Sequence, residues 1–85
     1  MNDNEIKMIK ERCDKTTPGP WKSFVEGRDH LSGSSFIRTA GDDIELIGAT
    51  IDDQDFIAAC RQDILLLIDE IERLKGILDK NGIEY

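Results

Sequence analysis

Residues of the kinds that build catalytic and metal sites are scarce in this sequence. Its 85 residues include one histidine, one tryptophan, one tyrosine and two cysteines. The histidine, His30, has no cysteine and no second histidine near it, so the usual zinc-ligand spacings are missing. Serines follow His30, but nothing in the pattern holds a hydroxyl against the imidazole, as nucleophilic catalysis requires. We therefore expect no enzyme activity, no metal and no cofactor.

Long apolar runs and a targeting segment are also missing. No stretch is apolar over the length that a bilayer-spanning helix needs, and no secretory signal is recognisable. Cys13 and Cys60 are far apart in the chain and fall on apolar faces, which favours reduced, buried thiols over a disulfide. The sequence therefore predicts a cytoplasmic protein without membrane contact.

Positive charge is in short supply as well. Eleven lysines and arginines stand against 18 acids, and the formal net charge is −7. A general nucleic-acid-binding protein carries a basic surface, so that class is disfavoured. The charge is uneven, because bases outnumber acids seven to four in residues 7–38, while acids outnumber bases nine to four in residues 52–85. This asymmetry allows attraction between the two halves, or binding of a small anion by the first half.

What the sequence does contain is one long periodic segment, residues 52–80. Its apolar side chains recur at alternating spacings of three and four, which is the heptad pattern of a helix that pairs with another helix. Asp52 or Asp53 is suited to cap the first turn, and Asn81-Gly82 is suited to end the last one. The apolar positions of the heptad are Ile57, Cys60, Ile64, Leu67, Ile71, Leu74 and Leu78.

A helix over residues 52–80 would be about 43 Å long, whereas a compact chain of this size has a radius of gyration of about 12 Å. The helix therefore overhangs its domain or is covered by a partner; the alternative is a single core helix that frays or kinks at Gly76. We expect its first half to cover a sheet through Phe56, Ile57, Cys60 and Ile64. We expect its second half to mediate oligomerisation through Leu67, Ile71, Leu74 and Leu78.

The rest of the chain predicts a single α+β domain over residues 1–85. A first helix covers residues 3–15 and stops at the Pro18-Gly19-Pro20 turn. Residues 21–49 read as a three-stranded antiparallel meander, whose apolar face needs a helix on top. The long helix packs on this sheet, and residues 81–85 form a tail.

One candidate binding site combines an aromatic ring with cations. Trp21 suits either a core plug at the corner between helix and sheet or a stacking platform for a base. A small anionic nucleotide requires stacking for its base and charge-assisted hydrogen bonds for its phosphate. The alternative is that cations on the outer face of the meander serve solubility alone. We assign the ligand-binding role to Trp21, Arg28, His30, Arg38 and Arg61.

Residues 17–21 read TPGPW, and residues 55–63 read DFIAACRQD and run into a leucine-rich helix. In these two segments the chain resembles a family of small bacteriophage and prophage proteins, most of them uncharacterised. The segments occur in the same order and at similar spacing in that family. The chain departs from it at Cys60, where alanine is usual, and in the loop 26–35. The resemblance implies a phage protein in the host cytoplasm, and no particular activity.

Two hypotheses on function follow. The first is a non-enzymatic, phage-type binding protein, an anti-defence sponge that sequesters a small anionic nucleotide immune signal. It rests on a likeness in size, acidity and expected oligomeric state to other small phage proteins, and not on a motif. The alternative is an interaction factor, an inhibitor or adaptor of a host protein, that acts through the long helix. In both hypotheses the chain also pairs with itself.

Overall fold

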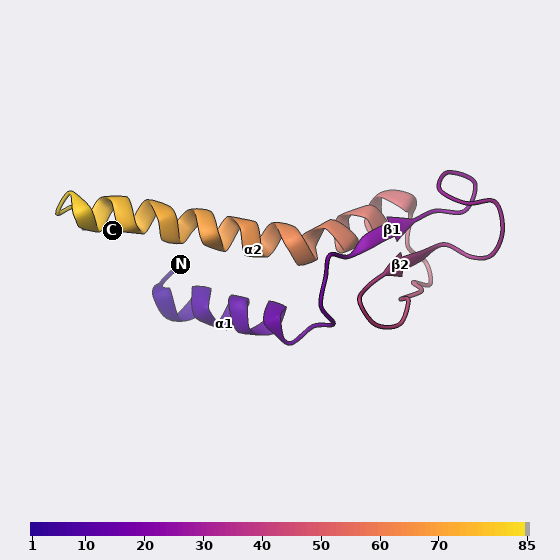
Figure 1. Cartoon of the computed structure of the whole chain (residues 1–85), viewed down its shortest axis with the longest axis horizontal. Coiled ribbons are helices and arrows are strands. Elements are labelled where there is room, and N and C mark those ends of the chain that lie inside the picture. Colours follow the sequence, from indigo (N-terminus) through magenta and orange to yellow (C-terminus); the bar gives the residue numbers. More distant parts are fainter. Residues whose placement is uncertain (85) are drawn as a thin grey trace.

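The chain folds into two helices joined by a small hairpin, and the computed structural model describes residues 1–84. The elements are α1 (Asp3–Asp14), β1 (Lys22–Phe24), β2 (Phe36–Arg38) and α2 (Ile51–Lys80). Figure 1 shows α2 running most of the length of the molecule, with α1 beside it and the hairpin extending past its N-terminal end. The predicted α+β class, with an N-terminal helix, an antiparallel sheet and a long C-terminal helix, is confirmed.

α1 runs antiparallel to α2 and covers one side of its central turns. A capping box at Asn2 begins the helix, which ends one residue before the predicted end. At its start, Asp3 forms an ion pair with Lys75. At its other end, the Cys13 thiol donates a hydrogen bond to the carbonyl of Arg61 at 3.4 Å. These two contacts fix the direction of α1 along α2.

The predicted three-stranded meander over residues 21–49 is confirmed only in part, because the sheet has two strands. The third stretch keeps a single bridge, in which the backbones of Ile37 and Ile44 exchange hydrogen bonds of 2.8 and 2.9 Å. Burial still alternates as far as Leu46, which is half-buried, and Ile47 is fully exposed. Gly48 then adopts a φ of +82°, a left-handed conformation that interrupts an extended strand.

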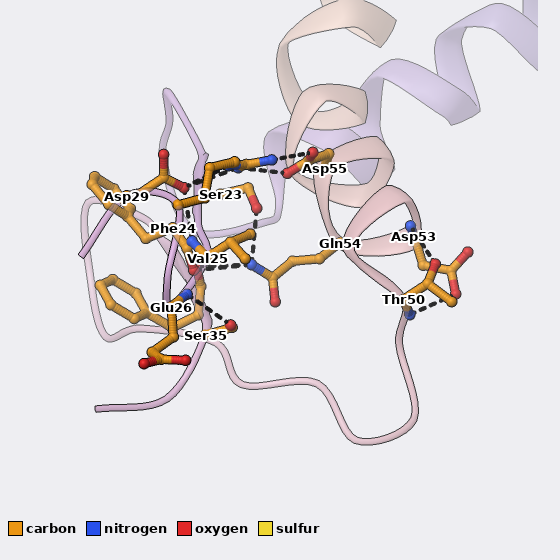
Figure 2. Close-up of polar contacts among 12 residues, drawn as sticks. Ser23, Phe24, Val25, Glu26, Asp29, Ser35, Thr50, Asp53, Gln54 and Asp55 are labelled. Carbon is orange, nitrogen blue, oxygen red and sulfur yellow. Dashed lines mark hydrogen bonds and ion pairs between the residues drawn. The ribbon is translucent and has the colours of Figure 1, made fainter. Parts of the chain in front are cut away.

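α2 begins at Ile51, one residue before the predicted start, because Thr50 is its cap. The Thr50 hydroxyl accepts from the Asp53 N–H, and the Asp53 carboxylate accepts from the Thr50 N–H, both at 3.0 Å (Figure 2). Asp53 therefore serves the cap from within the first turn and is not the cap residue itself. At the other end, Asn81 and Gly82 end the helix as predicted, with Gly82 at a φ of +69°.

Two glutamines of α2 anchor the hairpin. Gln54 is only 5% exposed, and its Nε2 donates to the Ser23 hydroxyl at 2.8 Å and to two strand carbonyls at 3.2 and 3.3 Å (Figure 2). Two turns later, the Gln62 side chain accepts from the Trp21 N–H at 2.7 Å and donates to the Trp21 carbonyl at 2.9 Å. Polar side chains thus bond to the backbone at and before β1, where an apolar cover was expected.

The predicted apolar cover of the sheet is therefore wrong. Residues four apart share one face of a helix, so Ala58 is buried on the same side as Gln54. Of the four predicted residues, Ile57, Cys60 and Ile64 lie on a neighbouring side, and Phe56 lies on the opposite side. Two of them are exposed, Phe56 and Ile57. The other two are half-buried beside α1, Cys60 and Ile64.

α2 overhangs the rest of the chain, as its predicted length implies. The molecule measures 57 × 22 × 21 Å and has a radius of gyration of 16.9 Å, well above the roughly 12 Å of a compact chain of this size. The helix continues through Gly76 without a break and extends past the start of α1 (Figure 1). No helix within residues 1–84 has the length and apolarity to cross a membrane. Residue 85, in the predicted tail, lies outside the described residues.

Replacing Gln54 by alanine should lower the free energy of unfolding by about 1–3 kcal/mol, because buried strand carbonyls would lose their donor. Urea unfolding followed by circular dichroism measures this change. Asp69→Ala is the matched control, since Asp69 is exposed on the same helix. A loss for Gln54→Ala no larger than that of the control would show that Gln54 does not anchor the hairpin.

Candidate functional site

The hairpin presents aromatic rings and cations on the face that points away from α2. Residues directly opposite in antiparallel strands share a face, and Lys22 pairs with Arg38 while Phe24 pairs with Phe36. The two phenyl rings stack with their centroids 5.3 Å apart. The Arg38 guanidinium lies 4.7 Å from the Phe24 centroid and 5.6 Å from the Phe36 centroid, and the Lys22 ammonium lies 5.1 Å from the Phe24 centroid. These distances fit cation–π contacts.

His30 extends this surface from the loop between the strands. Its ring centroid lies 5.6 Å from that of Phe36. Its Nδ1 lies 2.6 Å from the Ser32 carbonyl oxygen, so this nitrogen carries the proton in that contact. Its Nε2 is buried and has no hydrogen-bond partner within residues 1–84. The surface, here named the aromatic–cation face, consists of Lys22, Phe24, His30, Phe36 and Arg38.

The two cations of the aromatic–cation face are not neutralised. In the described part of the chain, neither Lys22 nor Arg38 forms an ion pair with an acid. A guanidinium that lies on a ring still has N–H donors directed outward in its plane. The face can therefore accept a phosphate or carboxylate, although the whole chain carries a formal charge of −7.

Arg28 is committed to an internal ion pair. Its Nη1 and Nη2 donate to the two carboxylate oxygens of Asp55 at 2.7 and 3.0 Å, and its Nε donates to Asp29 at 3.0 Å. The hydrogen bonds from Arg28, and then from Ser23, lower the pKa of Asp55 to about 2. Arg28 therefore fastens the loop of the hairpin to α2, and its donors point at these two carboxylates.

Trp21 and Arg61 belong to a different place, a groove between α1 and α2. The groove has a volume of about 360 Å³ and is mostly apolar, with Ile9 and Ile64 among its lining residues. The indole Nε1 of Trp21 donates to the Thr17 carbonyl at 2.8 Å, so the ring is held by its own turn. The ring is half-buried, and this favours the predicted role as a plug at the corner between helix and sheet.

The five predicted ligand-binding residues therefore lie in three places. Only His30 and Arg38 share the aromatic–cation face. Trp21 and Arg61 line the groove, and Arg28 is held by carboxylates. The sequence reasoning missed the phenylalanines of the face. The signal that could have found them is the alternation in Lys22-Ser23-Phe24 and Phe36-Ile37-Arg38, which puts both rings on the same side as the cations.

The second candidate surface is the heptad of apolar residues along α2, here named the apolar stripe. It consists of the seven residues predicted as the heptad, from Ile57 to Leu78. Leu67 is 63% exposed and Leu74 is 47% exposed, while Ile71 and Leu78 are half-buried. All four residues predicted to mediate oligomerisation thus remain at least partly open to solvent.

The described residues show no group of three or more histidine, cysteine or acidic side chains placed to hold a metal ion. The single histidine is not hydrogen-bonded to a serine hydroxyl in residues 1–84; its Nδ1 donates to a backbone carbonyl.

In comparisons with protein-family models, curated proteins and solved structures, no match to this chain was found. The two surfaces described above, the aromatic–cation face and the apolar stripe, are the candidate sites for binding.

The Arg28–Asp55 pair predicts a loss of stability at acid pH. The folded-state pKa of Asp55, about 2, lies below its ordinary value of 3.8. The stabilisation is therefore complete above about pH 4 and is lost as the pH falls toward 2. NMR titration of the Asp55 carboxyl carbon should give a midpoint near 2, and Arg28→Gln should move it toward 3.8. Arg12→Gln, a matched change on α1, should leave it in place. A native midpoint near 3.8 would contradict the pairing.

Proposed function

We propose that the chain is a non-enzymatic interaction protein that assembles with a second copy through the apolar stripe of α2. The observation that carries this proposal is the exposure of Leu67 and Leu74 within a continuous heptad. Burial of one such side chain contributes about 1.5–3 kcal/mol. The stripe supplies seven positions from each chain, which together can offset an association cost of about 4–15 kcal/mol.

The assembled protein is proposed to act on a host protein as an inhibitor or adaptor, in a cytoplasm shared with the phage that encodes it. The resemblance at residues 17–21 and 55–63 supports the phage origin. In this proposal the apolar stripe is used for self-assembly. The aromatic–cation face stays available for the target, because it lies on the hairpin and its loop and not on the apolar stripe.

Leu67→Asp combined with Leu74→Asp should convert the assembly to a monomer. The reason is that two carboxylates per chain would then enter an apolar contact without partners. Sedimentation or light scattering at micromolar concentration measures the mass. Leu66→Asp is the matched control, since Leu66 is 64% exposed but lies off the stripe, and it should leave the mass unchanged. A native protein that sediments as a monomer would overturn the proposal.

A second candidate function is the sequestration of a small anionic nucleotide. The observation that favours it is the pair of unneutralised cations on stacked phenyl rings at the aromatic–cation face. Phosphate would be bound by Lys22 and Arg38, and a base would stack beside the rings. In this form of the hypothesis the ligand contacts His30 and Arg38, and not the other three predicted residues.

Titration calorimetry with a panel of cyclic nucleotides tests this second function. Arg38→Gln should weaken binding at least about tenfold, because a charge-assisted hydrogen bond to phosphate contributes about 1.5–3 kcal/mol. Lys80→Gln removes a cation at the far end of α2 and should leave the affinity unchanged. If no nucleotide of the panel releases heat, or if Arg38→Gln binds as the native chain does, the sequestration hypothesis is wrong.

A further inference from the structure

We infer that two copies of α2 pair in parallel and in register as a two-stranded coiled coil, so that both hairpins lie at the same end of the dimer. This inference rests on the proposed self-assembly and adds its geometry. Three features of the chain carry it: the residue types along the apolar stripe, the charges beside the stripe, and the position of α1.

The residue types of the stripe alternate. With the heptad positions lettered a to g, isoleucine fills three of the four a positions, and leucine fills two of the three d positions. β-branched residues at a with leucine at d favour two-stranded parallel pairing over larger assemblies. The residues at a are Ile57, Ile64, Ile71 and Leu78, and those at d are Cys60, Leu67 and Leu74.

The charges beside the stripe favour the parallel direction. In a parallel pair, the g residue of one helix faces the e residue five positions later on the other helix. Glu70 occupies g and Lys75 occupies e, so the dimer gains two contacts of opposite charge. Lys75 already binds Asp3 of its own α1, but an ammonium has three donors, so a second carboxylate is compatible with that bond.

The antiparallel direction brings like charges together. With the two stripes overlapped in opposite directions, g residues face g residues, and one register sets Asp63 beside Glu70 of the second copy. The e residues likewise face e residues, and a different register sets Arg61 beside Lys75 of the second copy. Each contact occurs twice in the dimer. Either register therefore has two repulsive contacts where the parallel pair has two attractive ones, and this disfavours the antiparallel arrangement.

The position of α1 leaves room for a parallel partner. α1 covers the e side of the stripe: Ile68 is 4% exposed, and Arg61 donates to the Thr16 hydroxyl at 2.7 Å. The g side is open, because Asp63 and Glu70 are both exposed. A second copy can therefore approach over the a, d and g positions without displacing α1.

Parallel pairing places the two hairpins of the dimer at the same end. Each hairpin docks at the N-terminal end of its α2 (Figure 1). In a parallel dimer the two aromatic–cation faces would therefore lie at the same end of the paired helices. A target with two anionic sites would then be bound at both, and the second contact would form at high effective concentration. Antiparallel pairing would place the two hairpins at opposite ends of the paired α2 helices.

Disulfide trapping at d positions tests the direction. Two variants carry one cysteine each: Cys13→Ser keeps Cys60, and Cys13→Ser/Cys60→Ser/Leu74→Cys places one thiol two heptads further on. In a parallel, in-register pair, each thiol lies beside the thiol at the same position of the second copy. Their Cα atoms are then within the roughly 4.4–6.8 Å that a disulfide spans. Oxidised glutathione should therefore double the mass of each variant on a non-reducing gel.

The outcomes separate the inference from the proposed function. If each variant is a dimer in reducing buffer and neither is trapped by oxidised glutathione, the helices are not parallel and in register, and only the inference fails. If the native chain is a monomer, the proposed function fails with it. A control with one thiol at the off-stripe position, Cys13→Ser/Cys60→Ser/Leu66→Cys, should not be trapped. Trapping of this control to the same extent would also overturn the inference.

Discussion

The side-chain amide of Gln54 is the contact that joins both strands of the hairpin to α2. A hairpin with three residues in each strand is marginal alone, because so short a ladder buries little surface. Gln54 satisfies backbone carbonyls of both strands at once, and it also binds the Ser23 hydroxyl. Gln62 then holds the backbone of Trp21 from both sides, so the chain is aligned with the helix from the turn into β1. The hairpin and α2 thus behave as one unit.

This polar docking explains why an apolar stripe remains on the surface. A helix has a limited circumference, and the side that carries Gln54, Ala58 and Ile68 is taken by the hairpin and α1. The heptad lies on the neighbouring side, where it borders α1 through Cys60, Ile64 and Ile71 and leaves Leu67 and Leu74 exposed. The two roles of α2 are therefore divided mainly between two sides of the helix, whereas the sequence pattern had suggested a division between two halves.

Local features of the fold could be predicted from the sequence, and non-local ones could not. Helix spans follow from capping residues, apolar periodicity and the turn 17–21, all of which act within a few residues. The prediction of a third strand failed because that strand forms only if the backbone beyond Ile44 stays beside β2. No local sequence preference decides this. The prediction of the side of α2 that packs on the hairpin failed as well. A glutamine can be identified as buried only when the hydrogen-bond acceptors around it are known. Arg28 looked available as a ligand group since its partner, Asp55, is 27 residues away.

The register of the hairpin links the docking of α2 to the binding surface. Side chains of a strand alternate between its faces, and a slip of one residue exchanges the two faces completely. The register that turns Ser23 and Ile37 toward α2 must therefore turn Lys22, Phe24, Phe36 and Arg38 away from it. This separation keeps the two cations clear of the acids on α2, and so leaves them unneutralised. The bonds of Gln54 thus hold the hairpin to the helix and, by selecting the register, also place the aromatic–cation face at the surface.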